Sequence, residues 1–215
     1  MAPTHWMRFG ISLLVLAGLG LGYQLLAPIL QPLPVYMALP AVSLTDQDGK
    51  NFELQQTRGK VVLLSPIYTH CPDICPITTG KMKQLQGEVR SAGLADQVQF
   101  VSFTVDPQRD TPEVLAGYAS VYGADLSNWV FLSGSAAQTQ ALIQRLGIYV
   151  EKVYYVAGTP YPETSLSGPP PNSSYLVNHT DRWFLIDREG NVRALPPGSR
   201  SDVGATFQLI QKLIR

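Results

Sequence analysis

Residues 60–76, KVVLLSPIYTHCPDICP, carry a buried strand, a turn with two cysteines and the start of a helix. Within residues 60–65, the positions from Val61 to Leu64 are all apolar, which is typical of a central strand in a sheet covered on both faces. Pro76 suits the first position of a helix, because the N–H that proline lacks has no partner there. The segment therefore predicts a strand, then Cys71 and Cys75, then a helix that runs to about Arg90.

Strand and helix signals alternate through the rest of the chain. Thr111 followed by Pro112, and the capping box from Ser135 to Gln138, each predict the start of a helix, the second of which ends at Gly147. A last helix is expected over about residues 202–214. Strands are expected at residues 51–55, 98–105, 129–132, 183–186 and 192–195, with turns at 46–49 and 187–190. This order predicts an α/β domain with helices on both faces of a central sheet, and a thioredoxin-like arrangement fits it.

Residues 157–172 are rich in Gly, Pro and Ser. A long loop is therefore expected there. Loops of this length in a compact domain are usually functional or mobile.

Residues 9–30, FGISLLVLAGLGLGYQLLAPIL, are almost entirely apolar. A helix of this length is about 33 Å long, which is enough to cross a hydrocarbon core of about 30 Å. A cleaved signal peptide is the alternative, but its apolar region is shorter, and Leu25 and Ala27 match the small residues of a cleavage site poorly. We therefore expect an uncleaved transmembrane anchor.

The flanks of this anchor predict its orientation. Arg8 is the strong positive charge beside it and lies on the N-terminal side, so residues 1–8 are expected in the cytoplasm and the domain outside it. Residues 31–40 are Pro-rich and are expected to be an extended spacer. Residues 41–215 then form the thioredoxin-like domain.

The charge balance excludes several classes of protein. The chain has 16 basic and 16 acidic residues in 215, and of these only Arg8 precedes Asp46. A nearly neutral domain is not a polybasic nucleic-acid binder. Two cysteines are too few for a disulfide-stapled miniprotein or a zinc ribbon. The function must therefore come from a site within one domain.

Cys71 and Cys75 are expected where a buried strand ends and a helix begins, and the partial positive charge of a helix N-terminus stabilises a thiolate there. An inert cystine is disfavoured, because closing so short a loop removes little chain entropy. An oxidising compartment would favour a disulfide unless the thiols are reduced or metallated. A redox dithiol and a metal site both remain open. Copper(I) is soft and accepts low coordination, so two thiolates and one imidazole would suffice for it.

Three histidines are available as a third ligand. His5 precedes the anchor and lies on the wrong side of the membrane. The side chain of His70 is expected to point away from that of Cys71 if the chain is extended there. His179 lies between the long loop and the strand at residues 183–186. This position is compatible with either a structural role or a role as a metal ligand.

The segments HCPDICP (residues 70–76), FTVDPQRDTPEVLAGY (103–118) and NHTDRWFLIDREG (178–190) resemble the Sco/SenC family of copper-binding proteins. The resemblance covers residues 41–215. It implies a thioredoxin-like fold, a membrane anchor, and a location on the outer, periplasmic side of the inner membrane. It also implies assistance in assembling the dinuclear copper (CuA) centre of cytochrome c oxidase.

By this resemblance, Cys71, Cys75 and His179 bind one copper ion, and the partner is cytochrome c oxidase subunit II. Another copper chaperone or a thiol reductant is a further expected partner. Two features depart from the family pattern: Asn178 replaces the usual Asp beside the histidine, and the loop before it is longer. In the VDPxRDTP segment, Asp106 and Arg109 are expected to fix a turn through a local ion pair rather than to react.

Two alternatives to a copper metallochaperone remain, and both are enzymes. In a thiol–disulfide oxidoreductase, Cys71 and Cys75 would reduce the cysteines of a partner, including those of the oxidase copper site. The CxxxC spacing differs from the CxxC of thioredoxin-type enzymes. A thiol peroxidase is disfavoured, since the spacing of Pro66, Thr69 and Cys71 differs from that of the peroxiredoxins.

Overall fold

The computed structural model describes residues 32–160 and 173–215, and residues 35–215 form one compact unit. The predicted cytoplasmic segment and the anchor at residues 9–30 lie outside the described residues. Within the described ranges, no helix has the length and apolar character needed to span a bilayer.

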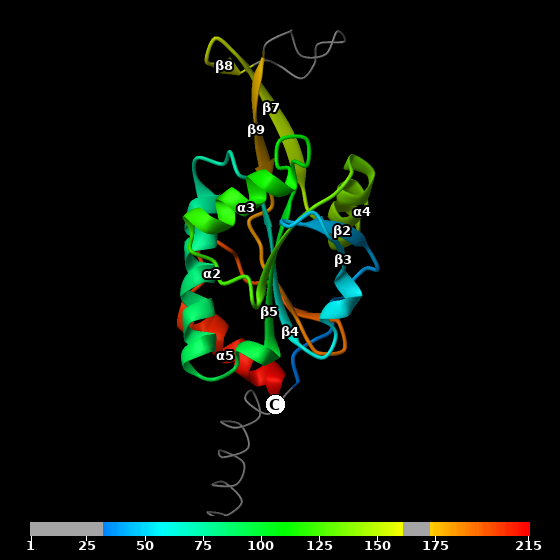
Figure 1. Ribbon diagram of the computed structural model, residues 1–215, viewed down its shortest axis with the longest axis vertical. Coiled ribbons are helices and arrows are strands. Elements are labelled where there is room, and N and C mark those ends of the chain that lie inside the picture. Colours follow the sequence, from blue (N-terminus) through cyan, green and yellow to red (C-terminus); the bar gives the residue numbers. More distant parts are fainter. Residues whose placement is uncertain (1–31, 161–172) are drawn as a thin grey trace, which may run out of the picture. The chain divides into compact units, whose positions relative to one another are not determined.

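The centre of the unit is an eight-stranded sheet (Figure 1). Its strand order is β1-β11-β10-β4-β5-β6-β2-β3, and the central β4, β5 and β6 are parallel. All other pairs are antiparallel. The strands are β1 (Met37–Ala38), β2 (Ser43–Asp46), β3 (Asn51–Glu53), β4 (Val61–Ile67), β5 (Val98–Thr104), β6 (Trp129–Ser133), β10 (Phe184–Ile186) and β11 (Asn191–Ala194).

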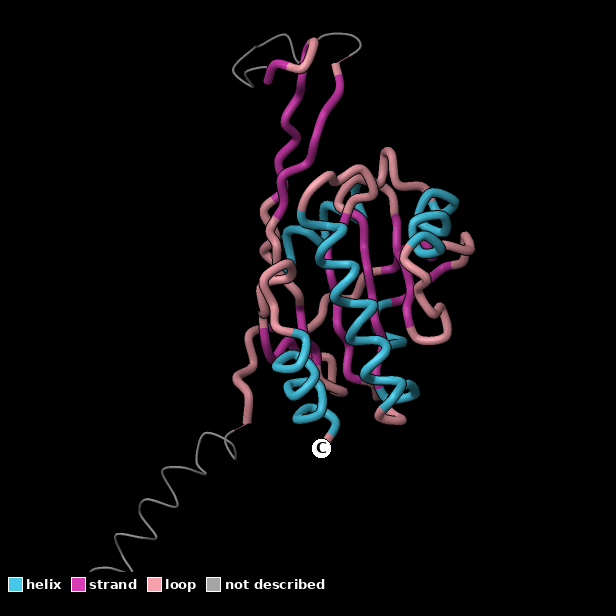
Figure 2. Tube along the Cα trace, turned by 90° about the vertical axis from the view of Figure 1, so that its left-hand side faces the viewer, coloured by secondary structure: helices cyan, strands magenta, loops and turns pink. Residues whose placement is uncertain are grey.

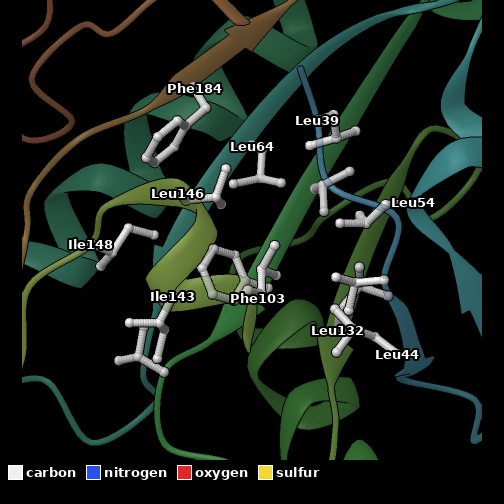
Figure 3. Packing of buried hydrophobic residues seen from close by; sticks show 14 of the residues in the cluster. Leu39, Leu44, Leu54, Leu64, Phe103, Leu132, Ile143, Leu146, Ile148 and Phe184 are labelled. Atoms are coloured by element: carbon white, nitrogen blue, oxygen red, sulfur yellow. The ribbon is translucent and has the colours of Figure 1, made fainter. Parts of the chain in front are cut away.

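Helices cover both faces of this sheet, as the sequence predicts (Figures 1 and 2). The helices are α2 (Ile74–Ser91), α3 (Pro112–Val121), α4 (Ala136–Leu146) and α5 (Val203–Ile214), with short 3-10 helices at Leu54–Thr57 and Ala95–Gln97. One core lies under α2, α3 and α5 and includes Trp129 and Trp183. The other lies under α4 and includes Leu64 and Phe103 (Figure 3). Because the two cores cover the sheet on both faces, every residue of the central strand β4 is buried.

The predicted turn and cap signals are confirmed. Thr111 caps α3 by accepting a hydrogen bond from the Val114 N–H. Ser135 and Gln138 form the capping box of α4, which ends at Gly147 in a left-handed conformation. The Asp187 carboxylate accepts from the N–H groups of Glu189 and Asn191 in the predicted turn. These local signals act over a few residues, so they do not depend on tertiary packing.

The start of α2 differs from the prediction. The helix begins at Ile74 with Asp73 as N-cap, so Pro76 is its third residue rather than its first, and Cys75 lies inside the first turn. Proline is tolerated there, because none of the first N–H groups of a helix has a partner within the helix.

The chain between α4 and β10 also differs from the prediction. The strands β7 (Val150–Val156), β8 (Thr159–Pro160) and β9 (Ser174–His179) form a second sheet in the order β8-β7-β9. Figures 1 and 2 show it as an arm that extends from one end of the main sheet. The predicted loop therefore begins with a turn and β8, and residues 161–172 of it lie outside the described residues. His179 ends a strand, where its backbone is fixed opposite Val150.

The predicted spacer contributes to the sheet. Met37 and Ala38 form β1 and pair with β11, and the Leu39 N–H donates to the carbonyl of Gly190.

Candidate metal centre

Cys71 lies on the turn between β4 and α2, which we call the cysteine turn (residues 68–73). Cys75 lies in the first turn of α2. Cys71 is half-buried and Cys75 is buried, and both are free thiols. The Cys75 backbone N–H donates to the Cys71 sulfur across 3.4 Å. The helix N-terminus therefore faces Cys71, as the sequence predicts.

The two thiols differ in acidity. A hydrogen bond from the Cys75 thiol, aided by the backbone N–H groups of Cys75 and Asp73, lowers the pKa of Cys71 to about 5. The same hydrogen bond and burial raise the pKa of Cys75 far above its ordinary value. At neutral pH the pair consists of a thiolate at Cys71 and a thiol at Cys75.

His179 reaches the cysteines from the end of β9. Its Nε2 lies 3.4 Å from the Cys75 Sγ, and its Nδ1 lies 3.1 Å from the carbonyl oxygen of Thr180. Donation of the Nδ1 proton to that carbonyl leaves Nε2 free to accept a hydrogen bond or bind a metal. Burial lowers the pKa of His179, so the imidazole is neutral at pH 7.

The chain after His179 is tied to the main body. The Thr180 N–H donates to the carbonyl of Tyr149, and the Thr180 hydroxyl accepts from the Tyr149 N–H, which continues the pairing of β7 and β9 by one position. The Asp181 carboxylate accepts from the N–H and the hydroxyl of Ser199. The histidine is thus held on both sides, by strand pairing before it and by these bonds after it.

Tyr68 forms one wall of the site. Its ring makes an edge contact with the His179 ring at a centroid distance of 6.0 Å. Burial raises its pKa to about 12, so it remains a neutral phenol. Next to it lies a cavity of about 280 Å³ lined by Tyr68, Cys71, Pro72, Asp73, Ile74, Leu176, Val177, Asn178 and His179. The cavity gives Cys71 and His179 one common space.

The fold brings together the three residues that the resemblance implies as ligands. At the bond lengths that sulfur and nitrogen make to zinc, about 2.3 and 2.0 Å, two tetrahedral ligand atoms are about 3.5 Å apart. The observed 3.4 Å between Cys75 and His179 fits one shared ion of similar size. In the part of the chain that the structure describes, no three His, Cys, Asp or Glu side chains are already spaced around a metal position. In this structure the Cys71 sulfur instead accepts a hydrogen bond from the Cys75 N–H.

His70 is no part of this group. Its side chain is 56% exposed and its Nδ1 lies 3.9 Å from Asp110. The chain forms a turn at Thr69 and His70 rather than the extended segment on which the prediction for His70 depended. The buried Asp110 carboxylate instead accepts from the N–H of Thr69 at 3.0 Å and from its hydroxyl at 2.6 Å. It thereby anchors the cysteine turn, a role that the sequence analysis missed.

The predicted ion pair between Asp106 and Arg109 is present, and Asp106 is fully buried. Arg109 also contacts Tyr175 on β9, which the sequence analysis did not predict. No local pattern signals a contact across 66 positions.

Asn178 is exposed, and its amide donates to the carboxylate of Glu151 across the arm. The partner of the imidazole Nδ1 is the Thr180 carbonyl instead. Asn178, which departs from the family pattern, therefore makes its hydrogen bond to Glu151, and the hydrogen bond of the His179 ring is with Thr180.

The family model described as SCO1/SenC matches residues 39–215. A protein from Stutzerimonas stutzeri that bears the name "Putative copper-binding protein" is 33% identical over 162 residues. That match covers 75% of this chain and 70% of the relative.

Two solved structures share the fold. A SCO1/SenC family lipoprotein from Bacillus anthracis is 29% identical, with a TM-score of 0.69 over 85% of this chain and 98% of its own. ScoI from Bradyrhizobium japonicum, solved with copper bound, is 25% identical, with a TM-score of 0.62 over 82% of this chain and 99% of its own. The thioredoxin-like Sco fold is confirmed by these likenesses.

Proposed function

Because this chain belongs to the SCO1/SenC family, we propose that its reduced form binds one copper ion through Cys71, Cys75 and His179 and delivers it to an oxidase. Sco proteins are a family of cytochrome c oxidase assembly proteins. The proposed recipient is the CuA centre on subunit II of cytochrome c oxidase.

The observation that carries this proposal is the approach of His179 Nε2 to within 3.4 Å of Cys75 Sγ, beside the thiolate of Cys71. Thiolate sulfur and neutral imidazole are the ligands that copper(I) accepts at low coordination number. Binding requires loss of the Cys75 proton, and the positive charge of the ion supplies the driving force for that loss.

An open coordination site would allow the copper ion to pass to a partner. Three ligands leave room for a thiolate or imidazole of the partner to attack before the donor ligands leave. His179 is the natural first ligand to leave, because it is neutral and comes from a different sheet than the cysteines. The cavity of about 280 Å³ between the two elements is the route of approach.

The location is part of the same proposal. Residues 9–30 anchor the domain in the inner membrane, and residues 35–215 stand on the periplasmic side, beside a membrane-embedded oxidase. The apolar run is long enough to span a bilayer, and Arg8 on its N-terminal side favours this orientation.

A second candidate function is favoured by the unequal acidities of the thiols. A thiolate at Cys71 attacks a disulfide of the partner and forms a mixed disulfide, releasing one partner thiol. Cys75, after losing its proton, then attacks the Cys71 sulfur and releases the second. The partner gains two electrons from the pair and two protons, one from Cys75 and one from solvent, and the Cys71–Cys75 pair becomes a disulfide.

Anaerobic titration of the reduced chain with copper(I), followed by X-ray absorption, tests the main proposal. We expect a stoichiometry near one, with two sulfurs and one nitrogen around copper. A stoichiometry near one that survives Cys71→Ala would contradict the proposed site. Sulfur-only coordination, or no retained copper, would favour the redox function.

A further inference from the structure

Arg109, on the loop between β5 and α3 (residues 105–111), holds the strand that carries His179. Its Nη1 donates to the carbonyl oxygen of Tyr175 at 2.9 Å. Its guanidinium carbon lies 3.7 Å from the centroid of the Tyr175 ring. Tyr175 precedes His179 by four positions on β9, so Arg109 binds both the backbone and the side chain of that strand.

Buried charge fixes the position of Arg109. The fully buried Asp106 carboxylate accepts from the Arg109 Nε and, at 3.0 Å, from the Tyr175 hydroxyl. Lys152 on β7 lies with its Nζ 3.7 Å from Asp106 and 4.4 Å from the Tyr175 ring centroid. Cation–aromatic contacts gain strength when they are shielded from water, so this cluster differs from an exposed ion pair.

The same loop also holds the cysteine turn. Asp110, next to Arg109, accepts two hydrogen bonds from Thr69, which precedes Cys71 by two positions. The guanidinium of Arg109 lies 5.9 Å from the Tyr68 ring centroid. Residues 106–110 therefore contact both the element that carries the cysteines and the element that carries the histidine.

The strand β9 depends on such contacts, because it is an edge strand. Among the described residues it pairs with β7 alone. On its other side, the Tyr175 carbonyl is held by Arg109, and the Val177 N–H is hydrogen-bonded to Tyr68. Without these ties, the arm could shift relative to α2 without breaking its own ladder.

We propose that Arg109 is a positioning residue that holds His179 at copper-binding distance from the cysteines. It touches no ligand and acts through β9. The proposal rests on the proposed function for its copper readout, and on the structure alone for its effect on β9.

The test compares Arg109→Met with Arg145→Met, a matched removal of an exposed arginine on α4. Copper(I) affinity is measured on the reduced chain by competition with a chromogenic chelator. Residues that orient a metal ligand typically contribute 10- to 100-fold in affinity. We expect a loss of about tenfold or more for Arg109→Met, and less than about twofold for Arg145→Met.

A double-mutant cycle separates positioning from general destabilisation. In the His179→Ala background, Arg109→Met should change copper affinity by less than about twofold, because its effect passes through the imidazole. Losses of equal size in both backgrounds, or unchanged affinity in Arg109→Met, would overturn the proposal. If Arg109→Met does not fold by circular dichroism, Arg109→Lys replaces it in the cycle, since it keeps the charge but loses the planar fork.

A second readout does not need copper. Amide hydrogen exchange at Leu176, Val177 and Asn178 should be faster in the apo Arg109 variant than in the wild type, while exchange in β4 stays unchanged. Unchanged exchange at β9 would overturn the inference even if copper affinity fell. If the wild type itself retains no copper, the proposed function fails, and this exchange measurement still decides the role of Arg109.

Discussion

The Cys75 sulfur and the His179 Nε2 lie 3.4 Å apart, although 104 positions separate them in the sequence. Cys75 belongs to a helix on the main sheet, and His179 ends a strand of the arm. Their meeting depends on how the arm is attached, and not on either segment alone. The chemistry of the pair should therefore respond to changes at both elements.

The first prediction separates the two candidate functions. His179→Ala should lower copper(I) affinity at least tenfold, because one of three ligands is lost, yet leave the rate of thiol–disulfide exchange within about twofold. Chelator competition and the reduction of a small disulfide measure the two effects.

His70→Ala is the matched control, since it removes an exposed imidazole beside Cys71. It should leave copper affinity unchanged. If His70→Ala and His179→Ala reduce affinity equally, the assignment of the third ligand is wrong.

The second prediction concerns the pH dependence of Cys71. The thiolate is the nucleophile, and the Cys75 hydrogen bond lowers the pKa of Cys71 to about 5. The rate of its alkylation by iodoacetamide should therefore be flat from pH 7 to pH 6 and fall as pH drops through about 5. Peptide mass spectrometry after timed labelling gives the rate at each cysteine.

Removing the donor should reverse this shift. In Cys75→Ala the first cause of the lowered pKa is absent, so the inflection should move upward and alkylation at pH 6 should slow. Wild-type Cys75 should stay unmodified throughout, because it is buried and its pKa is raised. An inflection that stays near pH 5 in Cys75→Ala would refute this account of the acidity.

Much of the domain could be predicted from the sequence, because its signals are local. The apolar run of β4, the Thr111 cap and the capping box at Ser135 each specify an element within a few residues. The ligand set came from the family resemblance, since the cysteine pattern alone left redox and metal roles open. Spacing along the chain could not indicate whether His179 reaches the cysteines.

The arm was missed for a physical reason. β7 and β9 are largely half-buried, so neither shows the strong apolar alternation of a strand with one buried face. Each is specified mainly by its partner across the intervening loop, and such pairing energy is not visible in either segment alone. The contact between Arg109 and Tyr175 depends on the same pairing.

The third prediction concerns Asp110, which holds the cysteine turn. Its buried carboxylate accepts hydrogen bonds from Thr69 and from the Thr104 hydroxyl. Asp110→Ala leaves these groups without their acceptor, so the free energy of unfolding should fall by about 3 kcal/mol. Urea denaturation followed by circular dichroism measures the change.

The control for Asp110 is Asp48→Ala, at an exposed position whose ion pair with Lys50 spans 3.8 Å. Exposed pairs contribute little, so the free energy of unfolding should change by less than about 0.5 kcal/mol. Equal losses in the two variants would show that Asp110 has no special structural role.

The fourth prediction concerns Gly198, which lies against the segment that follows His179. A Cβ at this position would stand 3.0 Å from the Thr78 Cγ2 and closer still to the Asp181 carboxylate, which is held by Ser199. Gly198→Ala should therefore displace Asp181, lower the free energy of unfolding by about 1–3 kcal/mol and weaken copper binding.

Gly87→Ala is the opposite case, since Gly87 is exposed within α2 and a Cβ there meets no atom within 4 Å. It should raise the free energy of unfolding by about 0.5–1 kcal/mol through helix propensity and leave copper affinity unchanged. If Gly198→Ala left both stability and copper affinity unchanged in urea denaturation and chelator competition, the tie between the residues after His179 and the main body would not control the site.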